Sequence, residues 1–152
     1  MSKIAEKLTE LGLTLPTVPA PVAAYVPAVR SGSYVYTSGQ LPLVEGALGV
    51  TGLLGADVTP EVGYEQARIA GLNALAAVAS VVELDDVVRV VKAVGYVASA
   101  PGFTGQPGVV NGASELFGAV FGDAGRHARS AVGVAVLPLN APVEVELIVE
   151  VR

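Results

Sequence analysis

Cysteine is absent from the 152-residue chain, and histidine occurs once, at His127. Without cysteine the chain can form no disulfide, hold no metal through thiolates and use no cysteine nucleophile. A single histidine argues against a histidine-based metal site and against a Ser-His-Asp triad. Any chemistry must therefore rest on other side chains, and these include arginine, carboxylates, hydroxyls and amides.

Charge is also scarce, because only 15% of the residues are charged and the net charge is -5. A small chain with so few charges is expected to bury part of its surface against copies of itself, so we predict a homo-oligomer. The acidic balance and the lack of a Lys/Arg cluster argue against a nucleic-acid backbone as the main partner.

Long apolar runs are missing as well. The stretch "VAVLPLNAPVEVELIVEV" is interrupted by prolines, Asn and glutamates, so it does not read as a membrane span. The charged, amphipathic start "MSKIAEKLTELGLTL" does not read as a signal peptide. We expect a cytoplasmic protein whose residues 1–152 form one domain, with an N-terminal helix and proline-rich connector over residues 1–24.

The order of the expected elements predicts an α+β fold. Ser2 and Thr59 are placed to cap helices, and Pro60 suits the first turn of the second one. The expected elements are a short helix ending at Gly12, a hairpin over 28–37, a long helix after Thr59, a strand over 85–99, a loop over 101–108, a helix that starts at 109 and is ended by Gly122, a turn over 123–125, and strands over 128–138 and 142–152. Two helices can cover only one face of such a sheet, so subunit association should hide the other face.

Arg129 is the first candidate for a binding residue. It lies at the start of an apolar strand whose same face continues with Ala131, Gly133 and Ala135. Small neighbours leave space for a ligand, and a guanidinium grips a carboxylate through two parallel hydrogen bonds. The alternative is an arginine at a strand end that extends to solvent or pairs with an acid.

Other candidates carry weaker signals. Glu144 could act as a general acid/base, although alternating acids usually mark a solvated strand face. In "SGQ", Gly39 could let a ligand reach the backbone beside Ser38, or the segment could be a plain strand end. Tyr25 could be a pocket wall or a packed aromatic. Asn111 reads more readily as a helix cap, and His127 as a structural residue.

Taken together, "YVYTSGQLP", "VVNGASELFGAVFG" and "RSAVGVAVLPLNAPVEVE" resemble the reactive-intermediate deaminase family, also called YjgF/YER057c/UK114 or endoribonuclease L-PSP. The resemblance covers about Tyr25 to Val151. It implies a chorismate-mutase-like fold, a barrel-like homotrimer with ligand sites between subunits, and hydrolysis of enamines or imines such as 2-aminoacrylate to 2-oxo acids and ammonia without a cofactor or metal.

The resemblance also assigns roles to residues. Arg129 matches the arginine that binds carboxylates, Glu144 the acid that positions water, and Tyr25 the cleft tyrosine. Ser38 and Gly39 match the backbone that lines the pocket, and Asn111 matches an asparagine near a helix start. The chain departs from the family pattern at Val26 and Pro27 after the tyrosine, at the inserted "GAS" after Asn111, and at Ala131, where a cysteine is common.

The positions of Arg129 and Glu144 make a geometric prediction. The last two strands are expected to run antiparallel and to be joined through "LPLNA". Whether or not they are direct neighbours, about seven residues of strand then separate the two side chains along the sheet, on the order of 20 Å. One small acid could not then touch both residues within a single chain. We therefore predict a composite site in which each residue comes from a different subunit.

Four functions remain open on the sequence. The first is hydrolytic deamination of imines at Arg129 and Glu144. The second is a trimer that binds or senses a 2-oxo acid without chemistry. The third is an endoribonuclease, which the family's older name suggests and the acidic composition opposes. The fourth is a structural or chaperone-like trimer.

Overall fold

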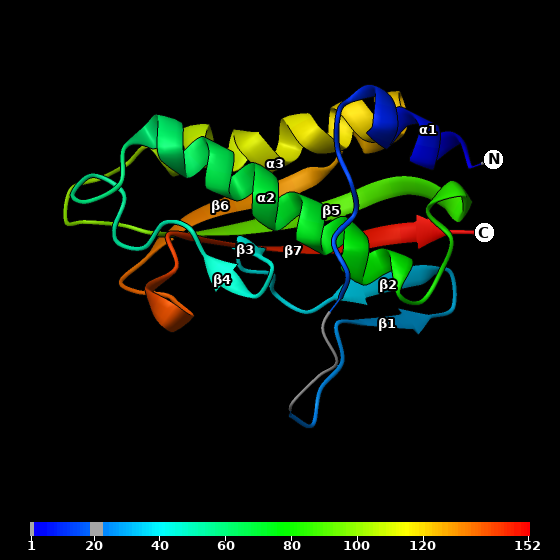
Figure 1. Cartoon of the computed structure of the whole chain (residues 1–152), viewed down its shortest axis with the longest axis horizontal. Coiled ribbons are helices and arrows are strands. Elements are labelled where there is room, and N and C mark those ends of the chain that lie inside the picture. The colour runs from blue at the N-terminus through cyan, green and yellow to red at the C-terminus, as the bar shows by residue number, and fades with distance from the viewer. Residues whose placement is uncertain (1, 19–22) are drawn as a thin grey trace.

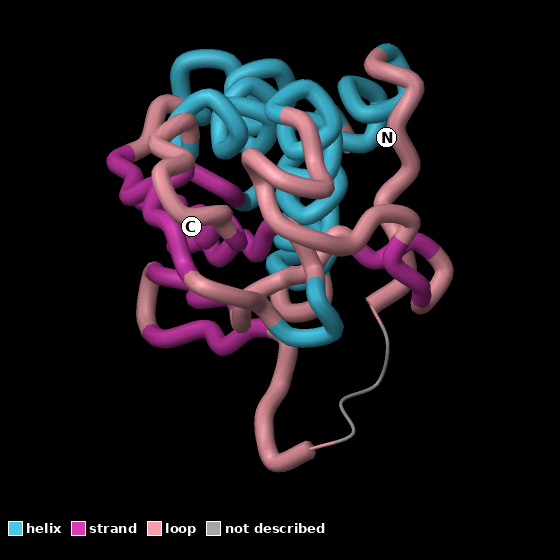
Figure 2. Tube along the Cα trace, turned by 90° about the vertical axis from the view of Figure 1, so that its left-hand side faces the viewer, coloured by secondary structure: helices cyan, strands magenta, loops and turns pink. Residues whose placement is uncertain are grey.

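The computed structural model describes residues 2–18 and 23–152, so part of the predicted proline-rich connector lies outside the described residues. The main helices form one layer over a five-stranded sheet (Figures 1 and 2). The helices and strands are α1 (Lys3–Glu10), β1 (Ala28–Ser31), β2 (Tyr34–Thr37), β3 (Leu43–Val44), β4 (Ala47–Leu48), α2 (Pro60–Ala79), β5 (Val87–Ala98), α3 (Gln106–Phe121), β6 (Ala128–Val134) and β7 (Val143–Val151).

The sheet is mixed, with the strand order β1-β2-β7-β5-β6. Strands β5 and β6 run parallel, whereas the β1/β2, β2/β7 and β7/β5 pairs are antiparallel. The predicted α+β class and the two helices on one face are therefore confirmed. Among the described residues, no helix combines the length and the apolar character needed to cross a bilayer.

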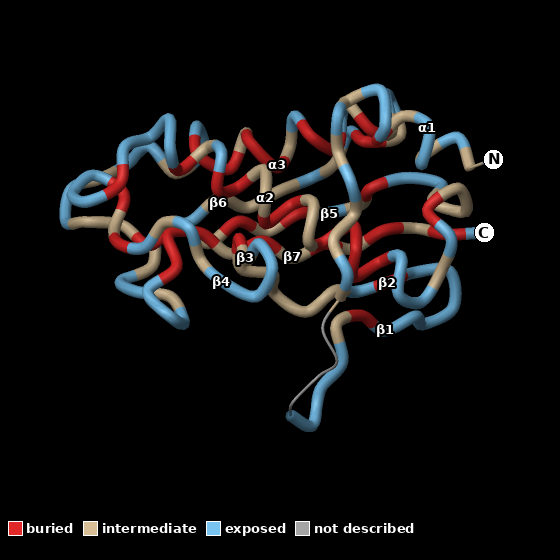
Figure 3. The backbone as a smooth tube through the Cα atoms, viewed as in Figure 1, coloured by how far each residue is buried: buried red, intermediate tan, exposed pale blue. Residues whose placement is uncertain are grey.

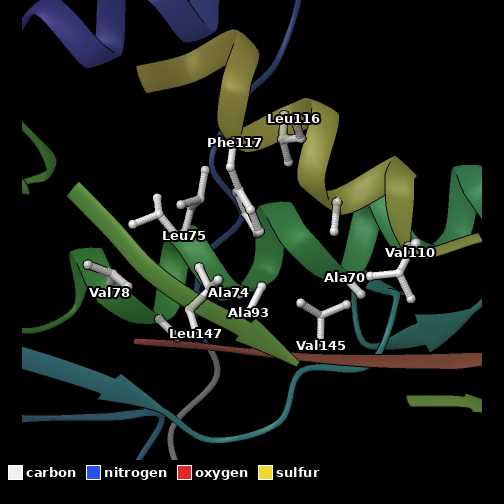
Figure 4. Close-up of a cluster of buried hydrophobic side chains, with 14 of the residues drawn as sticks. Ala70, Ala74, Leu75, Val78, Ala93, Val110, Leu116, Phe117, Val145 and Leu147 are labelled. Carbon is white, nitrogen blue, oxygen red and sulfur yellow. The ribbon is translucent and has the colours of Figure 1, made fainter. Parts of the chain in front are cut away.

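The core lies between this sheet and the helices α2 and α3. Alternate residues of β7 face it, with Val143, Val145 and Leu147 each 1% exposed. Figure 4 shows Val145 and Leu147 facing the alanines of α2 and Phe117 of α3. Figure 3 shows that the buried stretches of the sheet and of the helices face each other. Small residues bring the two helices close: a Cβ on Gly112 would lie 2.0 Å from the carbonyl oxygen of Tyr64.

The N-terminal helix α1 is tied to the loop before β5. Its predicted cap is confirmed, since Ser2 Oγ accepts from the Ala5 N–H. The carboxylate of Asp85 accepts from Ser2 Oγ at 2.7 Å and from the Ile4 N–H at 2.9 Å. Because these bonds favour the ionised form, the pKa of Asp85 is lowered. Leu8 then reaches the core with 4% exposure.

Helix α3 begins earlier than predicted. The segment "TGQPG" was expected to be loop, but the helix starts at Gln106, with Pro107 in its first turn. Proline is well tolerated there because the first N–H groups of a helix have no internal partner. Asn111 is consequently in the second turn, so its predicted position at the helix start is wrong and its side chain is free for another role.

The predicted spacing of Arg129 and Glu144 is also wrong. Strands β6 and β7 run antiparallel, as predicted, with β5 between them, but β6 ends at Val134 and the register brings the two residues closer. Arg129 pairs with Ala93 of β5, and Glu144 pairs with Tyr96 of the same strand. Their offset along the sheet is thus three residues, or roughly 10 Å.

Candidate functional site

Glu144 lies on the face of the sheet that points away from α2 and α3. Its neighbours Val143 and Val145 are buried on the helix side, and side chains alternate along a strand. Tyr96 stands beside it on the same face and donates to Glu146 Oε1 at 2.8 Å. Partial burial raises the pKa of Glu144, and the charge of Glu146 raises it further.

Gly39 is in direct contact with the Glu144 carboxylate. A Cβ at this position would lie 2.1 Å from Glu144 Oε1, so any larger residue would displace the acid. The segment is held in place because Gln40 and Val145 exchange backbone hydrogen bonds of 2.8 and 2.9 Å. Among the described residues nothing accepts the Gly39 N–H, so this donor is open to a ligand.

Ser38 joins the Tyr25 segment to this region. Its N–H donates to the Pro27 carbonyl at 2.8 Å, and its hydroxyl donates to the Val26 carbonyl at 2.7 Å. Tyr25, next to Val26, is 63% exposed and packs into no core of its own chain. Tyr25, Ser38, Gly39 and Glu144 therefore form one group, which we call the acid half-site.

Arg129 lies on the opposite face, because it pairs with Ala93, a core residue that is 1% exposed. Its guanidinium crosses from the edge strand β6 to α3. Nη1 donates to Asn111 Oδ1 at 2.8 Å and to Ser114 Oγ at 3.2 Å. Nη2 donates to the Pro107 carbonyl at 3.1 Å. Arg129, Asn111 and Ser114 form the second group, the arginine half-site.

These contacts leave part of the guanidinium available. Of its five N–H donors, Nε–H and one on Nη2 have no acceptor among the described residues. All three acceptors are neutral, and no described carboxylate lies within ion-pair distance of Arg129. The predicted alternative, in which Arg129 pairs with an internal acid, is therefore not what the described residues show.

The space predicted over the small residues of β6 is partly filled. A Cβ on Gly133 would lie 2.7 Å from Gln106 Nε2, so the Gln106 amide covers that end of the strand. Gln106 is fixed there because Nε2 donates to Ser99 Oγ and to the Phe103 carbonyl. The space predicted over the small residues of β6 is thus occupied by the Gln106 amide at the Gly133 end of the strand.

The six predicted site residues fall into two half-sites that cannot serve one ligand within a single chain. The half-sites are two strands apart, offset by roughly 10 Å along the sheet, and turned to opposite faces. The distance in the sequence prediction was too long, and the opposite orientation is the stronger reason for the separation.

Four groups near the two half-sites were not predicted from the sequence: Ser114, the Pro107 carbonyl, His127 and Glu146. Two spacings could have revealed Ser114 and His127. Asn111 and Ser114 are three residues apart and so share a helix face. His127 precedes Arg129 by two residues, which puts both on the same side of an extended segment.

The model of the family described as "YjgF/chorismate_mutase-like, putative endoribonuclease" matches residues 5–151. The chain belongs to this YjgF/chorismate mutase-like family. The resemblance noted in the sequence is therefore confirmed. The family model supports the fold class that the sequence predicted, and it extends over both half-sites.

Three relatives illustrate the range of this YjgF-like family. Protein TCP17 of Trypanosoma cruzi is 46% identical over 99% of this chain and 95% of its own length. A 2-iminobutanoate/2-iminopropanoate deaminase of Dermatophagoides farinae is 34% identical over 92% of this chain and 95% of its own length. The crystal structure of protein Atu1372 of Agrobacterium tumefaciens, of unknown function, has a TM-score of 0.92 and 46% identity, covering 99% of this chain and 93% of its own.

Proposed function

We propose that this protein hydrolyses small 2-imino acids, or the enamines in equilibrium with them, to 2-oxo acids and ammonia. The site forms where the arginine half-site of one subunit meets the acid half-site of another, in a homotrimer. The name of the Dermatophagoides farinae relative supports the substrate class, since that protein is an iminobutanoate and iminopropanoate deaminase.

The state of Arg129 is the observation that carries the proposal. The half-buried guanidinium is held by three neutral acceptors and has no carboxylate partner among the described residues. Its Nε–H and one Nη2–H are left for the two oxygens of a ligand carboxylate. A 2-imino acid carries that carboxylate next to its reactive carbon. A clamp on the carboxylate therefore fixes the position of the imine carbon.

The acid half-site supplies the remaining chemistry. Glu144, in its ionised form, accepts a proton from a water molecule while the water oxygen bonds to the imine carbon. Glu144 passes this proton to the imine nitrogen, which gives a carbinolamine with one hydroxyl and one amino group. Glu144 then takes the hydroxyl proton and delivers it to the amino nitrogen as the C–N bond breaks, so the carbonyl forms and ammonia leaves. The Gly39 backbone is next to the Glu144 carboxylate, and its N–H has no acceptor among the described residues, so it can donate to the substrate or the water.

A coupled assay tests the proposal. A dehydratase acting on threonine generates 2-iminobutanoate, and the protein is expected to accelerate the release of 2-oxobutanoate above the spontaneous rate. The decay of the imine absorbance measures this directly. Saturable binding of 2-oxobutanoate without any acceleration would instead favour the metabolite-binding function, and an unchanged rate with no binding would contradict both.

The pH dependence of kcat/KM should respond to the charge of Glu146. Glu144 must be ionised to accept a proton, so kcat/KM should rise with pH through its raised pKa. Glu146→Gln removes the repelling charge, lowers the pKa of Glu144 and should move this acid limb to lower pH. Burial, the larger cause of the shift, remains, so the limb should move only part of the way.

Glu150→Gln is the matched control for this measurement. Glu150 lies on the same strand and the same face as Glu144, but six residues away, or roughly 20 Å. Its removal should leave the limb in place. A limb that moves equally in both variants, or stays fixed in Glu146→Gln, would show that Glu144 is not the titrating base.

A further inference from the structure

Arg129 is connected to the chain's single histidine through Ser114. Ser114 Oγ lies 3.2 Å from Arg129 Nη1 and 2.8 Å from His127 Nε2. The other ring nitrogen, Nδ1, lies 2.7 Å from the Gly125 carbonyl oxygen. The His127 ring also packs edge-on against Phe117, with ring centroids 5.6 Å apart and an interplanar angle of 77°. These contacts leave the imidazole little freedom to turn.

The hydrogen-bond directions in this chain follow from the chemistry of its ends. The Gly125 carbonyl can only accept, so Nδ1 of His127 carries a proton. In a neutral imidazole Nε2 then accepts, and the Ser114 hydroxyl donates to it. The lone pairs of Ser114 Oγ are left for Arg129 Nη1, which can only donate. Each group therefore has one consistent role, and the direction runs from Arg129 through Ser114 and His127 to Gly125.

We propose that Ser114 and His127 are positioning residues that orient the Arg129 guanidinium for carboxylate binding. Without Ser114, the guanidinium would be held only by Asn111 at Nη1 and by the Pro107 carbonyl at Nη2. Ser114 is the second acceptor of Nη1, so the donors without an acceptor are on Nε and Nη2, the two nitrogens that can grip one carboxylate together. His127 acts on the ligand only through Ser114. This inference rests on the proposed function. It names the two residues that determine how tightly Arg129 binds the substrate carboxylate.

The test measures the Kd for 2-oxobutanoate by calorimetry and the KM for enzymatically generated 2-iminobutanoate. Ser114→Ala is expected to raise both by about tenfold, with a smaller change in kcat, because a hydrogen bond to a charged group is lost. Ser114→Thr keeps the hydroxyl and should restore both values to near those of wild type. An equal loss of affinity in Ser114→Ala and Ser114→Thr would indicate a packing defect and would overturn the assignment.

A matched pair of substitutions tests His127. His127→Asn keeps a donor near Nδ1 but offers no acceptor at Nε2, so it should behave like Ser114→Ala. His127→Gln places an amide oxygen near Nε2 and should keep most of the affinity. The Ser114→Ala/His127→Asn double variant should be no weaker than Ser114→Ala alone, since residues in one network are non-additive. Additive losses of affinity would show that Ser114 and His127 act independently, and would overturn the proposal.

Two further readouts keep these outcomes distinct. Nitrogen NMR of the wild-type protein should find the neutral form of His127 protonated on Nδ1 and bare on Nε2, and the opposite tautomer would refute this hydrogen-bond chain. Undiminished 2-oxobutanoate binding by Arg129→Ala would refute the proposed function and the relay with it. Loss of binding in Arg129→Ala alone, with Ser114→Ala and His127→Asn binding as wild type does, would refute only the relay.

Discussion

Arg129→Ala is expected to reduce kcat/KM for 2-iminobutanoate by at least about a hundredfold, because a bidentate, charge-assisted pair to the carboxylate is lost. The fold should be retained, since Arg129 lies on the edge strand β6 and contributes to no part of the apolar core. The coupled imine assay measures the loss, and thermal unfolding checks that the structure persists.

Arg129→Lys should also be severely impaired, by at least about tenfold, because an ammonium group cannot present two parallel donors while still reaching Asn111 and Pro107. Arg126→Ala is the matched control, because Arg126 carries the same charge, lies three residues before Arg129 and has an exposed side chain. That variant should keep its activity. Equal losses in Arg126→Ala and Arg129→Ala would show that general electrostatic attraction, and not a specific clamp, accounts for the effect.

The sequence predicted the order of elements because local signals agreed with the global fold. Thr59 and Pro60 mark the start of α2, and the alternation in "VEVELIVEV" marks a strand with one buried face. The signals failed at the start of α3, where Gly105 and Pro107 favoured a loop. They also failed for the length of strand between Arg129 and Glu144, because the register of β6 and β7 against β5 depends on contacts between distant segments.

The site residues were predicted one by one, but their grouping was not. Whether Arg129 and Glu144 share a face depends on the register of β6 and β7 against β5, and a shift of one residue reverses it. The role of His127 was missed for a related reason. Its partner Ser114 is on a different element, and only the packing of α3 beside β6 brings the two side chains within 2.8 Å.

Mixing two inactive variants should restore activity, because the half-sites belong to different subunits. Arg129→Ala damages only the arginine half-site, and Glu144→Gln damages only the acid half-site. In a randomly mixed oligomer, about one interface in four would combine two intact halves. Co-expression of the two chains is therefore expected to recover about a quarter of wild-type activity, although either variant alone has almost none.

Co-expression of Arg129→Ala with Arg129→Lys provides the control. Every interface in that mixture contains a damaged arginine half-site, so activity should not exceed the average of the two variants. Native mass spectrometry must confirm that the active mixture contains both chains in one assembly. Mixed assemblies without recovery, or a protein that remains monomeric while active, would contradict the composite site. Recovery near the expected quarter would require the two half-sites, which face opposite sides of one sheet, to meet across a subunit boundary.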